Sequence, residues 1–113
     1  MEYFIYRLKD TDNLEPLRFL GSRALKRSNW WPIIPENYEI IYWSSCNDDT
    51  PVASALEGIF TKFNVAHPKG FHHYSLSVGD IVVLHGKESG AFFCDSAGWM
   101  EIPAFFEFVS ADK

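Results

Sequence analysis

The sequence has few cysteines, no long apolar run and no basic leader segment. Cys46 and Cys94 are its only cysteines, and they lack the CxxC spacing of a metal or redox pair. Because 47% of the residues are hydrophobic and 17% are aromatic, the chain can fill a core without a disulfide, and we expect reduced thiols. No window approaches the ~18 uninterrupted apolar residues that a membrane span needs. These absences predict a cytoplasmic protein with no membrane association.

Basic residues are in the minority. Ten Lys and Arg residues against fifteen Asp and Glu residues give a formal net charge of -5, and such a field repels a phosphate backbone. The basic residues concentrate in one segment, at Arg18, Arg23, Lys26 and Arg27. We interpret this segment as a solvated face, which disfavours nucleic acid as the partner. One alternative stays open, a nucleic-acid-associated module in which this segment meets phosphates while Trp30 or Trp31 stacks on a base.

The sequence also lacks a glycine-rich phosphate loop, internal repeats and low-complexity stretches. Gly86, Gly90 and Gly98 have the spacing of hairpin turns, without the strand-to-helix context that a phosphate loop requires. Composition does not change abruptly anywhere along the chain. We therefore expect residues 1–113 to form a single domain.

Five segments have the side chains of β-strands. Residues 3–8 and 38–43 are rich in β-branched and aromatic side chains, and each is followed by a polar turn. Residues 81–84, 91–94 and 99–102 are short apolar runs joined by glycine-containing turns. The last three predict an antiparallel meander.

Residues 51–63 have the pattern of an amphipathic helix. Thr50 can cap the first free backbone amides, and Pro51 in the first helical position loses no hydrogen bond. Asn64 can close the helix in a left-handed conformation. Apolar residues recur at separations of three and four, at Val52, Leu56, Ile59, Phe60 and Phe63. We expect this whole stripe, Phe60 included, to pack across one face of the sheet.

A weaker helical pattern covers residues 14–25. Pro16 suits only a first turn and Gly21 weakens the middle, so we expect a short, irregular helix there. The prolines of residues 30–35 favour an extended loop. Together these elements predict an α+β fold: a mainly antiparallel sheet of about five strands, with the 51–63 helix on one face and the shorter helical segment near 14–25.

From Tyr38 onward the order of motifs resembles the YodL-like domain. The residues that carry the resemblance are Phe63-Asn64, Pro68, the segment Ser75-Leu76-Ser77-Val78-Gly79-Asp80, Phe93-Cys94-Asp95-Ser96 with Gly98, and Phe105. The family is one of small bacterial domains, often found in Firmicutes and in mobile-element gene sets, alone or fused to larger proteins and with no agreed activity. The resemblance therefore implies a non-catalytic accessory or protein-interaction domain, linked to mobile genetic elements, with another protein as its partner and no cofactor.

The polar residues of these motifs are the candidate binding site. They are Asn64, His73, Ser75, Ser77, Asp80, Asp95 and Ser96, and Trp99 lies beside them in the sequence pattern. Short polar side chains at strand entries commonly bond local backbone amides, which is a structural role. The alternative is a recognition groove that these groups surround. The sequence leaves both interpretations open.

Two enzyme hypotheses rank last. His67, His72 and His73, with Cys94 or Asp95, offer nitrogen, sulfur and oxygen ligands to a divalent metal. Cys94 with His85 or His73 as base offers a thiol nucleophile. Loop histidines are more often solvated, and a cysteine in an apolar strand more often packs as a small hydrophobic residue. We therefore predict neither a metal site nor a catalytic residue.

Overall fold

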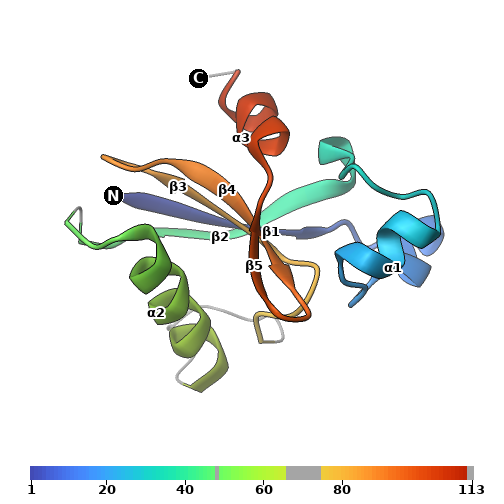
Figure 1. The fold of residues 1–113 in the computed structure, drawn as a ribbon, viewed down its shortest axis with the longest axis horizontal. Coiled ribbons are helices and arrows are strands. Elements are labelled where there is room, and N and C mark those ends of the chain that lie inside the picture. The colour runs from blue at the N-terminus through green and yellow to red at the C-terminus, as the bar shows by residue number, and fades with distance from the viewer. Residues whose placement is uncertain (48, 66–74, 112–113) are drawn as a thin grey trace.

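Five antiparallel strands form one sheet in the order β2-β1-β3-β4-β5 (Figure 1). The structure is a computed structural model and describes residues 1–47, 49–65 and 75–111. The strands are β1 (Glu2–Leu8), β2 (Tyr38–Ser45), β3 (Ile81–His85), β4 (Gly90–Asp95) and β5 (Gly98–Glu101). The helices are α1 (Ser22–Arg27), α2 (Val52–Val65) and α3 (Pro103–Ser110), with 3-10 turns η1 (Asp12–Leu17) and η2 (Pro35–Asn37). The predicted α+β class is confirmed.

β1 lies inside the sheet, between β2 and β3. Both partner strands lie far from β1 in the sequence, so β1 joins the sheet through non-local pairings. The β3-β4-β5 segment is the antiparallel meander that the turn pattern predicts, with Ile81 opposite Phe93 and Cys94 opposite Trp99. Among the described residues, no helix is long and apolar enough to cross a bilayer.

Helix α2 covers one face of the sheet through Leu56, Ile59 and Phe63. The prediction that Phe60 packs in the same stripe is wrong, because its side chain is 36% exposed at the rim of the helix. The helix also continues through Asn64 to Val65, and Asn64 does not take a left-handed conformation. Tertiary packing of the fully buried Phe63 extends the helix beyond the point where local sequence favours an end.

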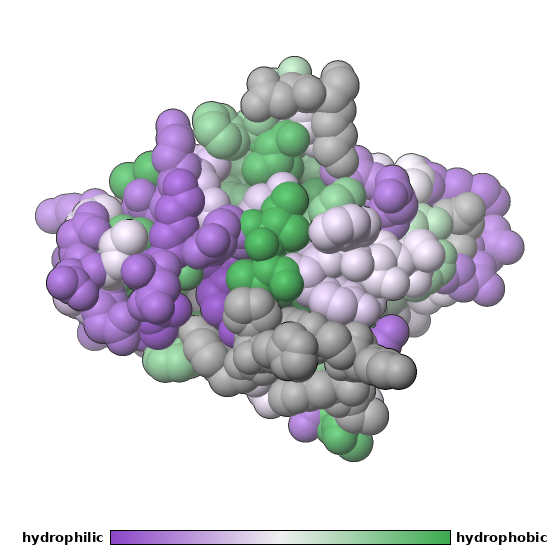
Figure 2. Space-filling view, turned by 180° about the vertical axis from the view of Figure 1, so that it is seen from behind, coloured by the Kyte–Doolittle hydropathy of each residue, from purple (hydrophilic) through white to green (hydrophobic). Residues whose placement is uncertain are grey.

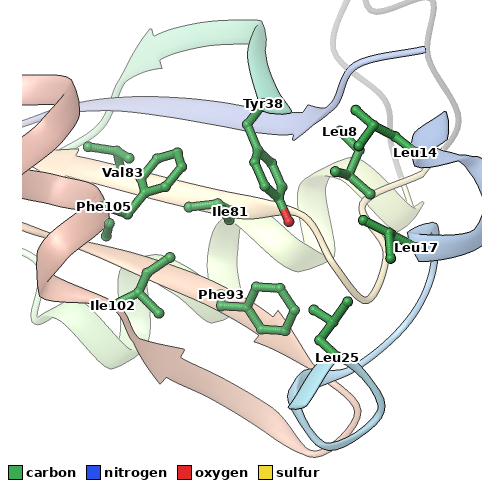
Figure 3. Close-up of a cluster of buried hydrophobic side chains, with 11 residues drawn as sticks. Leu8, Leu14, Leu17, Leu25, Tyr38, Ile81, Val83, Phe93, Ile102 and Phe105 are labelled. Carbon is green, nitrogen blue, oxygen red and sulfur yellow. The ribbon is translucent and has the colours of Figure 1, made fainter. Parts of the chain in front are cut away.

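The other face of the sheet is covered by α3, α1 and the two 3-10 turns, around a second apolar cluster (Figure 3). Its buried members are Leu8, Leu14, Leu17, Leu25, Tyr38, Ile81, Val83, Ala91, Phe93, Ile102 and Phe105. Helix α3 was not predicted from the sequence. Pro103 stands at its start, a position that favours proline, and Phe105 anchors it between the rings of Tyr6 and Tyr38.

The single irregular helix expected over residues 14–25 is divided into η1 and α1. Phe19 has a φ of 68° between them, and a left-handed residue cannot continue a right-handed helix. The 30–35 loop packs on the second cluster, where Trp31 meets Phe93 edge to face with ring centroids 5.5 Å apart. Trp30 and Trp31 are both half-buried.

Candidate functional site

A hollow of about 260 Å³ lies between α2 and the β4-β5 hairpin. It is lined by Glu57, Phe60, Ser77, Val78, Cys94, Asp95, Ser96, Gly98 and Trp99. Four of these residues, Ser77, Asp95, Ser96 and Trp99, belong to the candidate site expected from the sequence. Because the described residues of the lining include two carboxylates and no Lys, Arg or His, we call it the acidic hollow.

Two aromatic rings from different elements meet at this hollow. Phe60 of α2 and Trp99 of β5 lie with ring centroids 6.4 Å apart and ring planes at 90°. This edge-to-face arrangement fixes both rings while leaving Phe60 partly in water. Because Phe60 lies outside the buried stripe of α2, its ring forms one wall of the hollow. Sequence periodicity alone assigned the residue to the core.

Asp95 ties the hollow to α1. Its Oδ1 accepts hydrogen bonds from the backbone N–H groups of Ser22, at 3.0 Å, and Ser96, at 2.8 Å, and its Oδ2 accepts one from the Ser22 hydroxyl. Burial raises the pKa of this carboxyl, but the hydrogen bonds from Ser22 and Ser96 outweigh burial and lower the pKa below its ordinary value. Asp95 is therefore negatively charged at neutral pH. Glu57, on the exposed side of α2, adds a second carboxylate.

Asp80 belongs to the interior and not to the hollow. Its Oδ1 and Oδ2 accept hydrogen bonds from Nε and Nη2 of Arg7, at 2.8 and 2.7 Å, and both side chains are 5% exposed. The Ser77 backbone N–H donates a further bond of 2.8 Å to Oδ2. The Ser75 carbonyl accepts from Arg7 Nη2 at 3.1 Å and from the Ser77 hydroxyl at 2.9 Å. The polar groups around Asp80 thus hold the turn before β3 against β1.

Sequence reasoning missed Arg7. The available signal is that Arg7 is the one charged residue between Tyr3 and Leu8, because a charge inside an apolar strand needs a buried partner. Gly79 supports the same turn. It has a φ of 99°, and its N–H donates to the Cys94 carbonyl at 2.8 Å.

Of the remaining candidate residues that the structure describes, Asn64, Ser75 and Asp80 do not line the hollow. Asn64 is half-buried near the end of α2 and does not line it. His73 lies outside the described residues, as do His67 and His72. In the described part of the chain, no three His, Cys, Asp or Glu residues come together as metal ligands.

Cys94 forms part of the wall of the hollow as a thiol. Burial raises its pKa to about 11, and the charges of Asp80, Asp95 and Glu57 add to that rise. Its backbone N–H bonds to the Asp80 carbonyl just before β3, whereas His85 ends that strand. At about 3.3 Å per residue these positions are roughly 16 Å apart, too far for the imidazole to act as a base for the thiol.

His85 instead packs between aromatic rings. Its ring centroid lies 5.6 Å from that of Phe4 and 5.1 Å from that of Phe106. The ring therefore serves as a packing group at the far end of β3.

The basic residues between Arg18 and Arg27 differ in their contacts. Arg18 is held by Glu15 at 3.2 Å and Asp10 at 3.8 Å, and its side chain is 13% exposed. Arg23, Lys26 and Arg27 are exposed on α1, and Lys26 Nζ lies 5.4 Å from the centroid of the Trp31 ring. One face of that indole is therefore already occupied by a cation.

The sheet, its two helical layers and the acidic hollow define a small α+β domain built on one antiparallel sheet. The chain belongs to the YodL-like domain family, whose model matches residues 2–105. The match extends the resemblance, seen from Tyr38 onward in the sequence, back through β1. Searches of curated proteins and of solved structures gave no match.

Proposed function

We propose that the chain is a non-catalytic interaction domain that binds another protein at the acidic hollow. The observation that carries the proposal is the combination of two perpendicular aromatic rings, Phe60 and Trp99, with the carboxylates of Glu57 and Asp95 around one small concavity. Aromatic side chains beside a concavity are typical of protein recognition, because they contribute large contact areas with little loss of side-chain freedom.

The chemistry of the lining favours a Lys or Arg side chain from the partner. A cation placed against an indole or phenyl ring is attracted by the ring, and a carboxylate nearby adds a charge-assisted hydrogen bond. The volume, about 260 Å³, accommodates one long side chain better than a nucleotide cofactor. A link of the protein to mobile genetic elements stays a prediction from the family resemblance.

Two features of the hollow support a role without catalysis. The Cys94 thiol has a pKa raised to about 11, so very little nucleophilic thiolate forms at neutral pH. The Asp95 carboxylate is occupied by hydrogen bonds from Ser22 and Ser96, so it is poorly placed to abstract a proton from a substrate.

The experiment is an NMR titration of the ¹⁵N-labelled protein with the capped peptides Gly-Arg-Gly, Gly-Lys-Gly and Gly-Glu-Gly. We expect the Arg and Lys peptides to shift the Trp99 indole N–H and the backbone amides of Ser96 and Gly98, and the Glu peptide to leave them in place. Trp99→Ala should abolish the shifts, while Trp43→Ala, which removes an exposed indole elsewhere, should preserve them. Equal shifts with all three peptides, or none with any, would exclude the proposal.

A further inference from the structure

A second hollow, of about 270 Å³, lies between α2 and the end of β2. Its lining includes Ser54, Gly58 and Lys62, which follow one another at intervals of four residues along α2 and so lie on one flank of the helix. Glu57 and Phe60, which line the acidic hollow, lie on the other flank of the buried stripe. The two hollows are therefore separate sites, and we call the second one the Lys62 hollow.

Lys62 gives this hollow a positive charge. It is the one charged residue among the described residues of the lining, and it forms no ion pair with a described residue. A helical side chain leans towards the N-terminus of its helix, which here is the direction of Gly58, and the space that a Cβ of Gly58 would occupy is open. The basic helix α1 lies at the opposite end of the molecule (Figure 1), where the rear view shows hydrophilic surface (Figure 2). Lys62 is therefore the local cation.

Tyr3 supplies a buried hydroxyl group. The residue lines the Lys62 hollow but is only 2% exposed, so it belongs to the floor. Its hydroxyl has no hydrogen-bond partner among the described residues. Burial raises the pKa of the hydroxyl, so it keeps its proton at neutral pH and can donate. Ser44, opposite Tyr3 on β2, offsets part of that rise without a hydrogen bond of normal geometry. A buried donor without a partner is uncommon, and at the floor of a hollow it is a binding group for a ligand.

Tyr3 and Lys62 lie close to each other in the fold. The Tyr3 ring packs edge to face against Phe63, the residue after Lys62, with ring centroids 6.5 Å apart. Ser45, Thr50 and Ser54 place further hydroxyl groups around the lining. A cation beside a neutral donor, in a hollow whose other described polar groups are uncharged, favours an anion with oxygen acceptors.

We propose that the Lys62 hollow binds a small organic oxyanion, with its charged oxygens held between the Lys62 ammonium group and the Tyr3 hydroxyl. The body of the ligand runs along Gly58 towards the hydroxyls of Ser54 and Thr50. A ligand with hydroxyl groups of its own fits this lining, because hydroxyls both donate and accept hydrogen bonds. Carboxylates and phosphate esters share this chemistry, and the volume suits a molecule smaller than a nucleotide. The site is independent of the function proposed for the acidic hollow.

The test is an NMR titration of the ¹⁵N-labelled full chain with glycerate and with glycerol phosphate, at an ionic strength held constant with NaCl. Both compounds carry a hydroxylated carbon chain, and they differ in the anionic group. We expect at least one of them to shift the backbone amides of Cys46 and Gly58, and neutral glycerol to leave these amides in place. The compound that binds more tightly identifies the anionic group as carboxylate or phosphate.

Matched pairs of variants test the two binding groups. Lys62→Met and Tyr3→Phe should each weaken binding more than about fivefold. Lys9→Met, at an exposed lysine, and Tyr6→Phe, on the α3 face of the sheet, make the same changes elsewhere and should bind like the wild type. Tyr3→Phe should melt no lower than the wild type, because it removes a hydroxyl that has no partner.

Four outcomes would each overturn the proposal. They are no shift with either anion, equal shifts with glycerol, equal weakening of binding by Lys9→Met and Lys62→Met, and a Tyr3→Phe variant that melts lower than the wild type but binds normally. The last result would mean that the Tyr3 hydroxyl serves the fold alone.

Discussion

Asp80 and Asp95 lie at neighbouring strand ends and have opposite environments. Asp80 precedes β3 and Asp95 ends β4, and the backbone of Cys94 bonds to the Asp80 carbonyl between them. Asp80 is buried against the guanidinium of Arg7, whereas Asp95 is half-buried and bonded to neutral partners at the rim of the acidic hollow. These two aspartates, which lie close together in the fold, thus have different roles. Asp80 stabilises the interior, and Asp95 presents a charge at the surface.

The partner explains the difference. A carboxylate removed from water needs a charged, well-placed donor, and Arg7 supplies two donors in a fixed geometry. Asp95 keeps part of its hydration, so backbone and hydroxyl donors are sufficient. Only the second arrangement leaves a charge where another molecule can reach it.

The largest effect should follow from breaking the buried pair. Asp80→Ala leaves the Arg7 charge buried without its partner and should destabilise the fold by about 3 to 5 kcal/mol. Urea unfolding measures this change. The double variant Arg7→Met with Asp80→Leu should lose much less than the sum of the single changes, because no unpaired charge remains. Additive effects would mean that the two side chains are not coupled.

Leu56 and Phe60, one turn apart on α2, give the next contrast. Leu56→Ala should cost about 2 to 5 kcal/mol, because it opens a cavity under the helix. Phe60→Ala should cost less than about 2 kcal/mol, because part of that ring is already in water. Equal shifts of the urea midpoint would place Phe60 back in the core and remove one wall of the hollow.

Asp95→Asn should have a smaller effect, and that effect depends on pH. The hydrogen bonds from Ser22 and Ser96 lower the pKa of Asp95 in the folded state, so the carboxylate stabilises the fold above the unfolded pKa of about 3.9. This stability is lost as pH falls through the folded pKa. We expect a difference of about 1 kcal/mol between wild type and variant at neutral pH that narrows below about pH 4. A difference independent of pH would contradict the role of the charge.

The two cysteines should differ in how fast a thiol reagent modifies them in the folded protein. Cys94 is buried and its pKa is raised to about 11, while Cys46 is half-exposed. A thiol reagent at about pH 8 should therefore modify Cys46 first. Mass spectrometry of partly modified protein identifies the site. Faster modification of Cys94 would indicate an activated thiol and revive a catalytic role for the hollow.

Local pattern was sufficient to predict the strands and the start of α2, because runs of β-formers bounded by turns and a proline at a helix start act over a few residues. The α3 helix was missed because its run of eight residues is too short and too apolar for periodicity to distinguish a helix from a strand. The β-bulge in β2, where Ile41 has no residue opposite it in β1, was also unpredictable, since it depends on how β2 pairs with β1.

The candidate site was predicted only in part, because some of its residues come together locally and others through contacts between distant parts of the sequence. Asp95, Ser96 and Trp99 come together because the β4-β5 hairpin is local. Ser77 joins them because Gly79 and Asp80, in the turn before β3, bond to the backbone of Cys94. The partnership of Asp80 with Arg7 joins residues 73 positions apart, and no local pattern reports it. Phe60 was assigned to the core because helical spacing gives a direction but not the width of the face that the sheet covers.

The central claim, that the acidic hollow recognises a basic side chain, is tested most directly by the dissociation constant of Gly-Arg-Gly for Glu57→Gln. The matched control is Glu101→Gln, which makes the same charge change on β5 outside the hollow. We predict that Glu57→Gln weakens binding several-fold while Glu101→Gln binds like the wild type, with unfolding free energies unchanged in both. Equal affinities for the two variants would contradict the account.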